Sequence, residues 1–303
     1  MNRARRFAPW SALLLISAAP GAPATRSVHD DSGGEVIVSS NDCRIVSLSP
    51  GTTAMLYAAG AGHCLVGTIA HSKEPAEAAS VPVVGDAETF DFERLLELRP
   101  TVVVVAIDVV QRVRIDRIRA LGLPVYQVHV TSLAQMPESL RRLGELTGTG
   151  TIARARAGEL GAALERLATR YRARPPVRVL YQIWDRPIYT IGGRHVISDA
   201  LRVCGAKNVF SDLDTAAPAV TREAAIARNP QLILVSAPPA SAGDWIAEWR
   251  KFPSVAAVRS GNLVPYADER MDRMGPSVIE ATANLCEVID RARPAPAALP
   301  AAP

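Results

Sequence analysis

The chain has 303 residues, of which 48% are hydrophobic and 21% are charged, a composition that suffices for the cores of two globular domains. Its formal net charge of +4 is spread over mixed arginines and glutamates without a basic block, which argues against a nucleic-acid partner.

The first 24 residues have the features of a secretory signal peptide. Three arginines, Arg3, Arg5 and Arg6, precede an apolar run over 10–19, and small residues follow at 22–24, where cleavage would occur. The alternative, a membrane anchor, is disfavoured because the run is far shorter than the ~20 apolar residues that span a bilayer. The sequence therefore predicts an exported chain with a flexible leader over 25–42, a segment rich in Ser, Asp and Gly.

Residues 43–148 alternate between strand-like and helix-like patterns. Buried strands are expected at 44–49, 64–70, 101–105 and 124–130, and helices at 53–61, 92–98 and 113–121. Such alternation produces a parallel sheet covered on both faces, because parallel neighbours are joined by crossover helices. We interpret this segment as an N-terminal α/β lobe.

A long helix is predicted over 149–173, near the middle of the chain. Apolar residues recur there at spacings of three and four, while arginines and glutamates occupy the other face. Pro175 and Pro176 end it, because proline cannot donate to a continuing helix. At about 1.5 Å per residue the helix is ~35 Å long, enough to cross a small domain. We predict that residues 149–174 connect two lobes.

The alternating pattern resumes over 175–291 and predicts a second α/β lobe. Strands are expected at 177–184 and 263–268, a strand or turn at 208–212, a helix leading into a strand over 221–237, helices at 195–205 and 277–291, and loops at 189–193 and around Trp245 and Trp249. Residues 292–303 are rich in Pro and Ala and are predicted to be a disordered tail.

One spacing occurs in both lobes. Glu93 lies seven residues before Pro100, Glu223 lies seven residues before Pro230, and in both cases a strand pattern follows the proline. A single glutamate at a helix start has a simple explanation, because its charge interacts favourably with the helix dipole. The matched pair leaves a second interpretation open, in which each lobe presents one functional carboxylate.

Four cysteines in an exported chain favour disulfide pairing. Cys43 opens the first predicted strand and Cys64 opens the second, and parallel neighbours begin at the same edge of a sheet, so this pairing is geometrically reasonable. Cys204 and Cys286 share another context, each within or at the end of a helical pattern. The alternative is four buried free thiols.

Motifs of catalysis are missing from the sequence. It contains no HExxH, GxSxG, GKS, GKT or CxxC, and its five histidines show no metal-ligand spacing. His71 alone follows a predicted strand at the edge where open α/β sheets bind ligands. The absence of these motifs argues against an enzyme and against a catalytic cofactor, and a secreted α/β enzyme of unrecognised active site remains the alternative.

Six segments, taken in order, carry a family resemblance. They are RIVSLSPGTTAMLYAAGAG, DFERLLELRPTVVVV, RALGLPV, DALRVCGAKNVFSD, VTREAAIARNPQLILVS and GPSVIEATANLC. Over 43–291 the chain resembles the periplasmic binding proteins of ABC importers for cobalamin, haem and ferric siderophores, and among them most of all the cobalamin-binding proteins. The resemblance implies an α/β fold of two Rossmann-like lobes joined by a single long backbone helix, the class III architecture.

The resemblance also implies a function. It describes a periplasmic, monomeric receptor that captures cobalamin or a related corrinoid and delivers it to an inner-membrane ABC permease dimer with its ATPase; a haem or ferric-siderophore carrier is the alternative. It implies a disulfide between Cys204 and Cys286, and it assigns Glu93 and Glu223 to docking on arginines of the two permease subunits. The connecting helix should limit lobe closure to small angles.

The ligand is expected between the lobes, on residues that follow the strands. The expected ligand residues are His71, Glu88, Phe90 and Asp108 in the N-terminal lobe and Gln182, Trp184, Asp185, Glu269 and Arg270 in the C-terminal lobe. Alanines replace the cleft tryptophans of cobalamin-binding proteins at Ala87, Ala106 and Ala217. Trp184 is either a substitute aromatic surface or a core tryptophan. His71 stands where the family has a tyrosine and can serve as an axial ligand to cobalt or iron.

Overall fold

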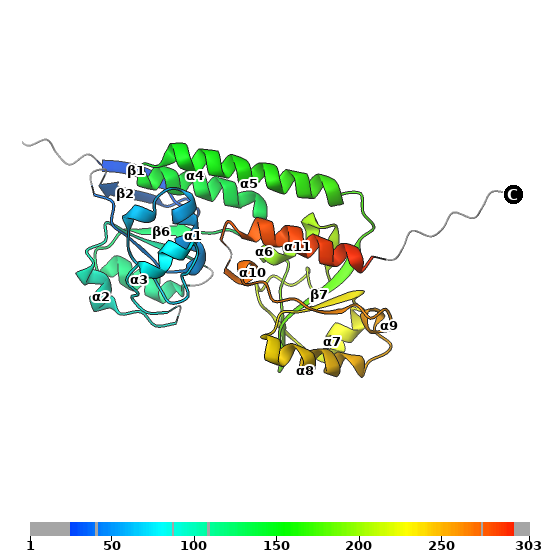
Figure 1. The fold of residues 1–303 in the computed structure, drawn as a ribbon. Coiled ribbons are helices and arrows are strands. Elements are labelled where there is room, and N and C mark those ends of the chain that lie inside the picture. Colours follow the sequence, from blue (N-terminus) through cyan, green and yellow to red (C-terminus); the bar gives the residue numbers. More distant parts are fainter. Residues whose placement is uncertain (1–24, 40–41, 87, 108–109, 274, 294–303) are drawn as a thin grey trace, which may run out of the picture.

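The computed structural model describes residues 25–39, 42–86, 88–107, 110–273 and 275–293, which form two α/β lobes below a pair of long helices (Figure 1). The predicted signal peptide lies outside the described residues, as does all but the first two residues of the predicted tail. Among the described residues, no helix combines the length and apolarity that spanning a membrane requires.

The N-terminal lobe contains the predicted parallel sheet, with strand order β4-β3-β5-β6. Its strands are β3 (Ile45–Ser47), β4 (Leu65–Gly67), β5 (Val102–Ala106) and β6 (Val125–Val128). Its helices are α1 (Pro50–Ala58), α2 (Phe92–Glu97) and α3 (Arg112–Ala120), with short 3-10 turns at Gly62–Cys64, Ala76–Ser80 and Leu133–Gln135. The expected order of strands and helices is confirmed.

Two antiparallel helices form the upper layer that joins the lobes (Figure 1). The connecting helix is confirmed as α5 (Gly150–Tyr171), but α4 (Met136–Thr147), which packs along it, was not predicted. The chain reverses at Gly148, whose φ of 77° is in the left-handed region. Gly144 allows the close approach of the helices, because a Cβ there would lie 2.3 Å from the Cβ of Ala153.

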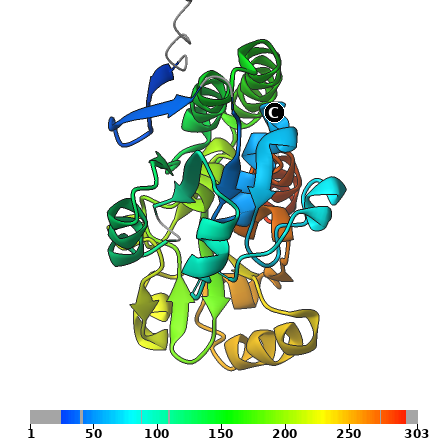
Figure 2. The ribbon, with the colours of Figure 1, turned by 90° about the vertical axis from the view of Figure 1, so that its left-hand side faces the viewer.

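Residues 25–39 form a β-hairpin, so the expectation of a flexible leader over 25–42 is wrong for this segment. The strands are β1 (Thr25–His29) and β2 (Glu35–Ser39), which lie beside α4 (Figures 1 and 2). The buried carboxylate of Asp30 accepts hydrogen bonds from the backbone and side chain of Gln127, and Asp31 forms a 3.1 Å ion pair with Arg142. These contacts with distant residues order the segment.

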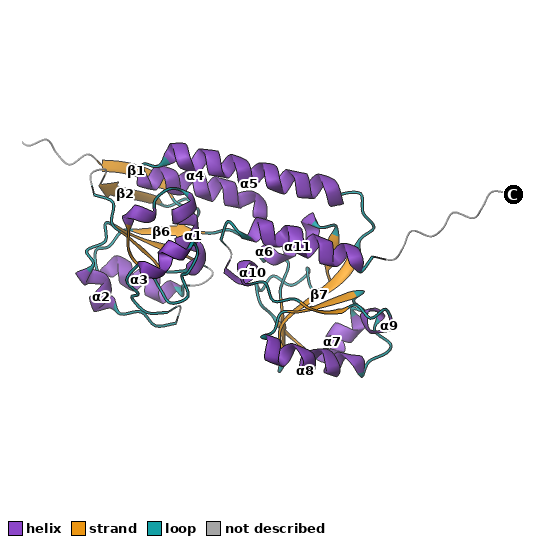
Figure 3. Ribbon diagram, viewed as in Figure 1, coloured by secondary structure: helices purple, strands orange, loops and turns teal. Residues whose placement is uncertain are grey.

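The C-terminal lobe contains a mixed sheet of six strands in the order β10-β8-β7-β11-β12, with β9 paired to β7. Figure 3 shows the strands of this lobe in orange around β7, with α8 below them. The strands are β7 (Val177–Trp184), β8 (Ile188–Thr190), β9 (Ala206–Asn208), β10 (Ala219–Val220), β11 (Leu232–Val235) and β12 (Leu263–Pro265). The loop expected at 189–193 is partly wrong, because β8 turns back antiparallel to β7 and β10 adds to its outer edge.

Six helices accompany this sheet. They are α6 (Val196–Val203), α7 (Arg222–Ala227), α8 (Pro239–Arg250), α9 (Ala256–Arg259), α10 (Glu269–Arg273) and α11 (Val278–Arg291). The loop expected around Trp245 and Trp249 is wrong, because both tryptophans lie on α8 and are buried. Pro239 occupies the first turn of α8, where a missing backbone N–H is tolerated.

Both predicted disulfides are present. Cys43 and Cys64 join the segments before β3 and β4, as expected for strands that start at the same sheet edge. Cys204, at the end of α6, is bonded to Cys286 within α11. The alternative of four free thiols is wrong.

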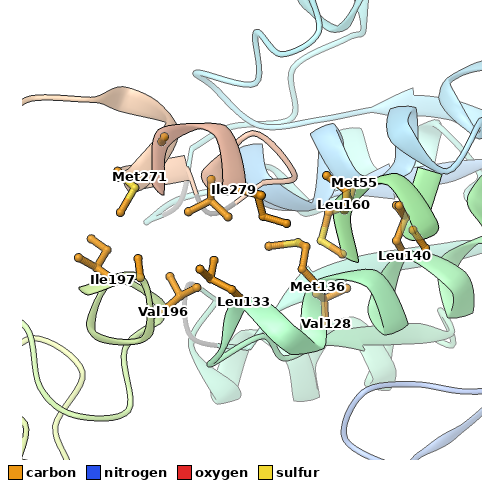
Figure 4. Close-up of a cluster of buried hydrophobic side chains, with 14 of the residues drawn as sticks. Met55, Val128, Leu133, Met136, Leu140, Leu160, Val196, Ile197, Met271 and Ile279 are labelled. Carbon is orange, nitrogen blue, oxygen red and sulfur yellow. The ribbon is translucent and has the colours of Figure 1, made fainter. Parts of the chain in front are cut away.

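One hydrophobic core runs through the junction of the lobes. It includes Met55 of α1 and Met136 of α4 on the side of the N-terminal lobe, and Ile197 of α6 and Ile279 of α11 on the other (Figure 4). Each lobe also has a separate core of its own on the side of its sheet away from this junction. The two lobes are therefore joined by packed side chains as well as by the chain itself.

Candidate functional site

A structural unit of one short helix and one strand occurs in both lobes. In the N-terminal lobe the side chain of Asp91 caps α2, and in the C-terminal lobe Thr221 caps α7. Both helices have six residues and carry a glutamate at the second position, Glu93 or Glu223. Each glutamate side chain is exposed, and the structure shows no ion pair for either among the described residues.

The two units also end alike. Arg99 (φ 45°) and Asn229 (φ 44°) adopt the same left-handed conformation directly before Pro100 and Pro230. A left-handed backbone conformation is uncommon for residues other than glycine. Its occurrence at the equivalent residue of both lobes indicates that the same structural unit is used twice.

An arginine from the neighbouring strand anchors each unit. Arg44 Nη2 donates to the carbonyl of Leu98 at 2.6 Å, and Arg178 Nη2 donates to the carbonyl of Asn229 at 3.0 Å. These two arginines were missed by the sequence analysis, although each stands at the start of a strand that neighbours the unit, one residue before β3 and at the second residue of β7. Aligning the sequence of the N-terminal lobe with that of the C-terminal lobe along this repeated unit would have placed the two arginines at equivalent positions. The anchors hold both glutamates in equivalent positions on their lobes.

Gln182 is an internal anchor of the C-terminal lobe, and its predicted contact with a ligand is wrong. Its side chain has no exposed surface. Its Oε1 accepts a hydrogen bond from Trp249 Nε1 at 2.7 Å, while its Nε2 donates to the backbone of Trp184 and to Asp185. Both faces of β7 are covered at this point, since Leu180, Tyr181 and Gln182 are all buried.

Trp184 lies at the carboxyl end of β7 and is 55% exposed, so it is not a core tryptophan. Its ring contacts Trp245 edge to face, with the centroids 6.0 Å apart. Tyr189 pairs with it across the β7–β8 ladder and is also exposed. The C-terminal lobe therefore presents exposed aromatic side chains at this sheet edge.

Asp185 binds Arg222, the first residue of α7. Its carboxylate accepts a hydrogen bond from Arg222 at 2.9 Å and from Arg186 at 3.1 Å. Burial acts to raise the pKa of Asp185, but the two arginine hydrogen bonds outweigh it and hold the pKa below its usual range. Arg222 in turn lies over the ring of Trp249, 5.1 Å from the centroid. Asp185 lines a pocket of about 600 Å³, yet its contacts make it a support for the helix that carries Glu223.

The residues expected in the N-terminal lobe lie in different environments. His71 is exposed, with a left-handed φ of 67°, and Glu88 is exposed as well. Phe90 is only 9% exposed, and its ring centroid lies 5.1 Å from that of Phe92, so little of the ring is available to a ligand in this structure. Asp108 lies outside the described residues.

Helix α10 brings the C-terminal lobe to the N-terminal lobe through a residue that was not predicted. Arg270 makes two hydrogen bonds to Asp268 within its own lobe, and these lower the pKa of Asp268. Arg273 instead reaches across and pairs with Glu74 at 3.5 Å, while also contacting Glu269. Its position, one helical turn after Glu269 and Arg270, is the signal that could have indicated it. The segment 71–74 and α10 therefore face each other across the junction.

Burial and the neighbouring Asp268 raise the pKa of Asp272 on the same helix. Within the described parts of the chain, no group of three or more His, Cys, Asp or Glu side chains is arranged to hold a metal ion.

A family model described as periplasmic binding protein matches residues 45–268, which span both lobes and the connecting helix. The chain belongs to the periplasmic binding proteins. This assignment confirms the resemblance and the two-lobed α/β fold, and it identifies a transport receptor that is not an enzyme.

Individual relatives carry the name of a ligand. The vitamin B12-binding protein of Yersinia pestis is 28% identical over 244 residues, which cover 80% of this chain and 85% of that protein. The crystal structure of the periplasmic vitamin B12 binding protein BtuF of Vibrio cholerae has a TM-score of 0.75 and 26% identity, covering 82% of this chain and 97% of that one. The periplasmic heme-binding protein RhuT from Roseiflexus sp. RS-1 has a TM-score of 0.72 at 22% identity, covering 83% of this chain and all of that one, and therefore shows the shared fold alone.

In this periplasmic binding protein, four of the predicted ligand residues are exposed. They are His71, Glu88, Trp184 and Glu269. Proteins of this family bind small molecules and act with ABC importers, and that statement applies to this chain.

Proposed function

We propose that this protein captures cobalamin or a related corrinoid in the periplasm and delivers it to an ABC permease dimer. It is made with a cleaved signal peptide and acts as a monomer. The ligand assignment is supported by relatives that carry the name vitamin B12-binding protein and share 26 to 28% identity over four fifths of this chain. No step of covalent chemistry is involved.

The observation that carries delivery is the duplicated unit. Glu93 and Glu223 occupy equivalent, exposed positions on helices that are capped, ended and anchored alike in the two lobes. In a dimeric permease each subunit can contact one lobe, so each carboxylate can bind an equivalent basic site on its own subunit. Carboxylates and arginines form charge-assisted, bidentate hydrogen bonds, which also fix orientation.

The test of delivery is charge reversal. Glu93→Arg and Glu223→Arg should each abolish uptake in cells while corrinoid affinity in vitro stays within twofold, because repulsion replaces attraction at a contact that must lose water on docking. Glu287→Arg, an exposed glutamate on α11, is the matched control and should transport normally. Normal uptake by the Glu93 and Glu223 variants would show that docking does not use these carboxylates.

The corrinoid would lie between the lobes, below α10. Trp184 can cover one face of the ring, and Glu88, Glu269 and Arg273 can bind its peripheral carboxamides by hydrogen bonds. Entry requires the Glu74–Arg273 ion pair to open, since it joins the two walls. These contacts recognise shape and periphery rather than the metal.

Haem is the competing ligand, and a substitution at His71 distinguishes haem from a corrinoid. If a corrinoid is held by its periphery, His71→Ala should weaken binding by about tenfold or less, the effect of about one lost hydrogen bond. If haem is the ligand, the same change should shift the Soret band and weaken binding far more. The decisive measurement is a spectrum of purified protein with cyanocobalamin and, separately, with haemin. A Soret shift with haemin and no corrinoid binding at micromolar concentration would overturn the corrinoid assignment and leave the docking proposal standing.

A further inference from the structure

The helix that carries Glu93 has an exposed apolar side chain beside this carboxylate. Leu96 follows Glu93 by three residues, so the two side chains lie on one face of α2. Leu96 is 40% exposed, whereas Leu95 is buried in the core of the lobe and Leu98 packs against that core. Helix α2 lies on the outer side of the N-terminal lobe, away from the junction (Figure 1). Leu96 is therefore available to a partner that approaches Glu93.

A second exposed apolar side chain lies next to the start of α2. Asp91, which caps this helix, donates its backbone N–H to the carbonyl of Val84 at 2.8 Å, so the segment around Val84 runs beside the cap. Val84 is buried, whereas its neighbour Val83 is 55% exposed. Successive side chains of an extended segment point in opposite directions, which explains the difference. Val83 and Leu96 give the N-terminal unit an exposed apolar margin.

The other charged groups of α2 have partners within the same unit. Arg94 forms a 3.0 Å ion pair with Glu97. The carboxylate of Asp91 accepts hydrogen bonds from the backbone N–H groups of Glu93 and Arg94. The carboxylate of Glu93 has no ion pair among the described residues. A partner of this unit therefore meets one uncompensated carboxylate with apolar side chains near it.

The corresponding unit of the C-terminal lobe has the carboxylate without the apolar margin. Ile226, three residues after Glu223, corresponds to Leu96, but it is half-buried and packs against the core of its lobe. Val220, directly before the cap of α7, packs against this core as well. Among the described residues, no large apolar side chain that is exposed lies on α7 or β10. The two units are thus alike in their carboxylates and unequal in exposed apolar surface.

We propose that Leu96 and Val83 make an apolar contact with the permease subunit that binds Glu93, so that the N-terminal lobe supplies most of the docking affinity. The partner surface has a basic side chain beside an apolar one. Isolated apolar residues are common on protein surfaces, but one beside a docking carboxylate excludes water from the contact. Exposed ion pairs contribute little by themselves, and buried apolar surface contributes more. This inference rests on the proposed function and extends its docking site.

The test compares Leu96→Gln with Leu121→Gln in cells that contain the transporter and lack the wild-type receptor. Both leucines are 40% exposed, and Leu121, at the end of α3, belongs to neither unit. With receptor limiting, initial uptake of labelled cyanocobalamin should fall at least about fivefold for Leu96→Gln and about twofold for Val83→Thr, and should not change for Leu121→Gln. Leu96→Met, which keeps an apolar side chain, should restore uptake. Circular dichroism and corrinoid affinity of the purified variants should match wild type.

Photocrosslinking tests the contact independently of the ligand. A benzophenone amino acid in place of Leu96 should crosslink in cells to a membrane subunit of the ABC transporter, identified by mass spectrometry, and the same amino acid in place of Leu121 should not. This measurement decides the matter if the wild-type receptor imports no cyanocobalamin.

Normal uptake by Leu96→Gln, or equal crosslinking from the two positions, would overturn the inference. If Glu93→Arg abolishes uptake in the same cells, the docking carboxylates stand and only the apolar contact fails. Normal uptake by Glu93→Arg would instead show that the proposed docking site itself is wrong. Failure of this inference is therefore distinguishable from failure of the proposed function.

Discussion

The ion pair between Asp185 and Arg222 fixes the first residue of the helix that presents Glu223, and Asp185→Asn tests its strength. The substitution keeps the shape of the side chain and removes the charge. Arg222, whose side chain is 19% exposed, would keep its charge on the pocket wall without a carboxylate at 2.9 Å. Its Nη1 already has no hydrogen-bond partner among the described residues, so no second acceptor stands ready.

The expected loss of stability follows from burial. The carboxylate of Asp185 is 8% exposed, so its hydrogen bond with Arg222 is largely screened from water and contributes about 2 to 3 kcal/mol. Arg186, whose side chain is 81% exposed, adds little. The folded pKa of Asp185 lies below its unfolded value of about 3.9. The contribution is therefore complete above about pH 4 and disappears as the pH falls through the lower folded pKa.

The assay is urea unfolding of the wild-type protein and the variant at pH 7 and at steps below pH 4. The matched control is Asp212→Asn, which removes the exposed partner of Arg228 at the other end of α7 and should cost much less because solvent screens that pair. Equal effects of the two substitutions at pH 7, or a difference from wild type that persists at acid pH, would refute the argument from burial.

Two further predictions concern what holds the fold together. Removing the Cys204–Cys286 disulfide, which spans 82 residues, should lower the free energy of unfolding by about 4.5 kcal/mol, and removing Cys43–Cys64, which spans 21, should lower it by about 3.3 kcal/mol. Urea unfolding of the two double-alanine variants measures both losses. A larger loss for Cys43–Cys64 would contradict the chain-entropy account. Asp30→Ala leaves unpaired the N–H groups that donate to this carboxylate, and it should lower the free energy of unfolding by about 2 to 4 kcal/mol. Amide hydrogen exchange should become faster over 25–39. Unchanged protection there would show that the hairpin does not depend on Asp30.

The sequence was sufficient for the elements whose signals are local. The valine run of β5, the stop at Pro100 and the spacing of α5 each depend on a few neighbouring residues, and each appears where expected. Helix α4 was missed although Met136, Leu140 and Leu143 have helical spacing, because Gly144 lowers its helix propensity and is explained only by its contact with α5. The hairpin was missed because its stability comes from contacts with residues about a hundred positions away.

The candidate site was predicted less well for a similar reason. The sequence indicates which segments follow the strands, but tertiary packing decides which side chains of a segment face outward. Gln182 and Trp184 are two residues apart on β7, yet Gln182 turns inward to Trp249 and Trp184 remains exposed. On α10, Arg270 folds back onto Asp268, and Arg273, one turn later, reaches the other lobe. The glutamate pair was found because its signal is a repeat, which needs no knowledge of packing.

The continuous core at the junction restricts how the cleft can open. Met55 and Met136 from one side pack with Ile197 and Ile279 from the other (Figure 4). Separating them would expose apolar surface to water, at a free-energy cost of about 25 cal/mol for each Å² exposed. The side chain of Asp199 on α6 also accepts a hydrogen bond from the backbone of the N-terminal lobe. The sheets below the junction have cores of their own, so we expect each to move as a unit. Ligand entry should then need only a small rotation and the opening of one ion pair, so the radius of gyration from small-angle scattering should change by less than about 1 Å when a corrinoid binds. A larger change would mean that the junction itself opens.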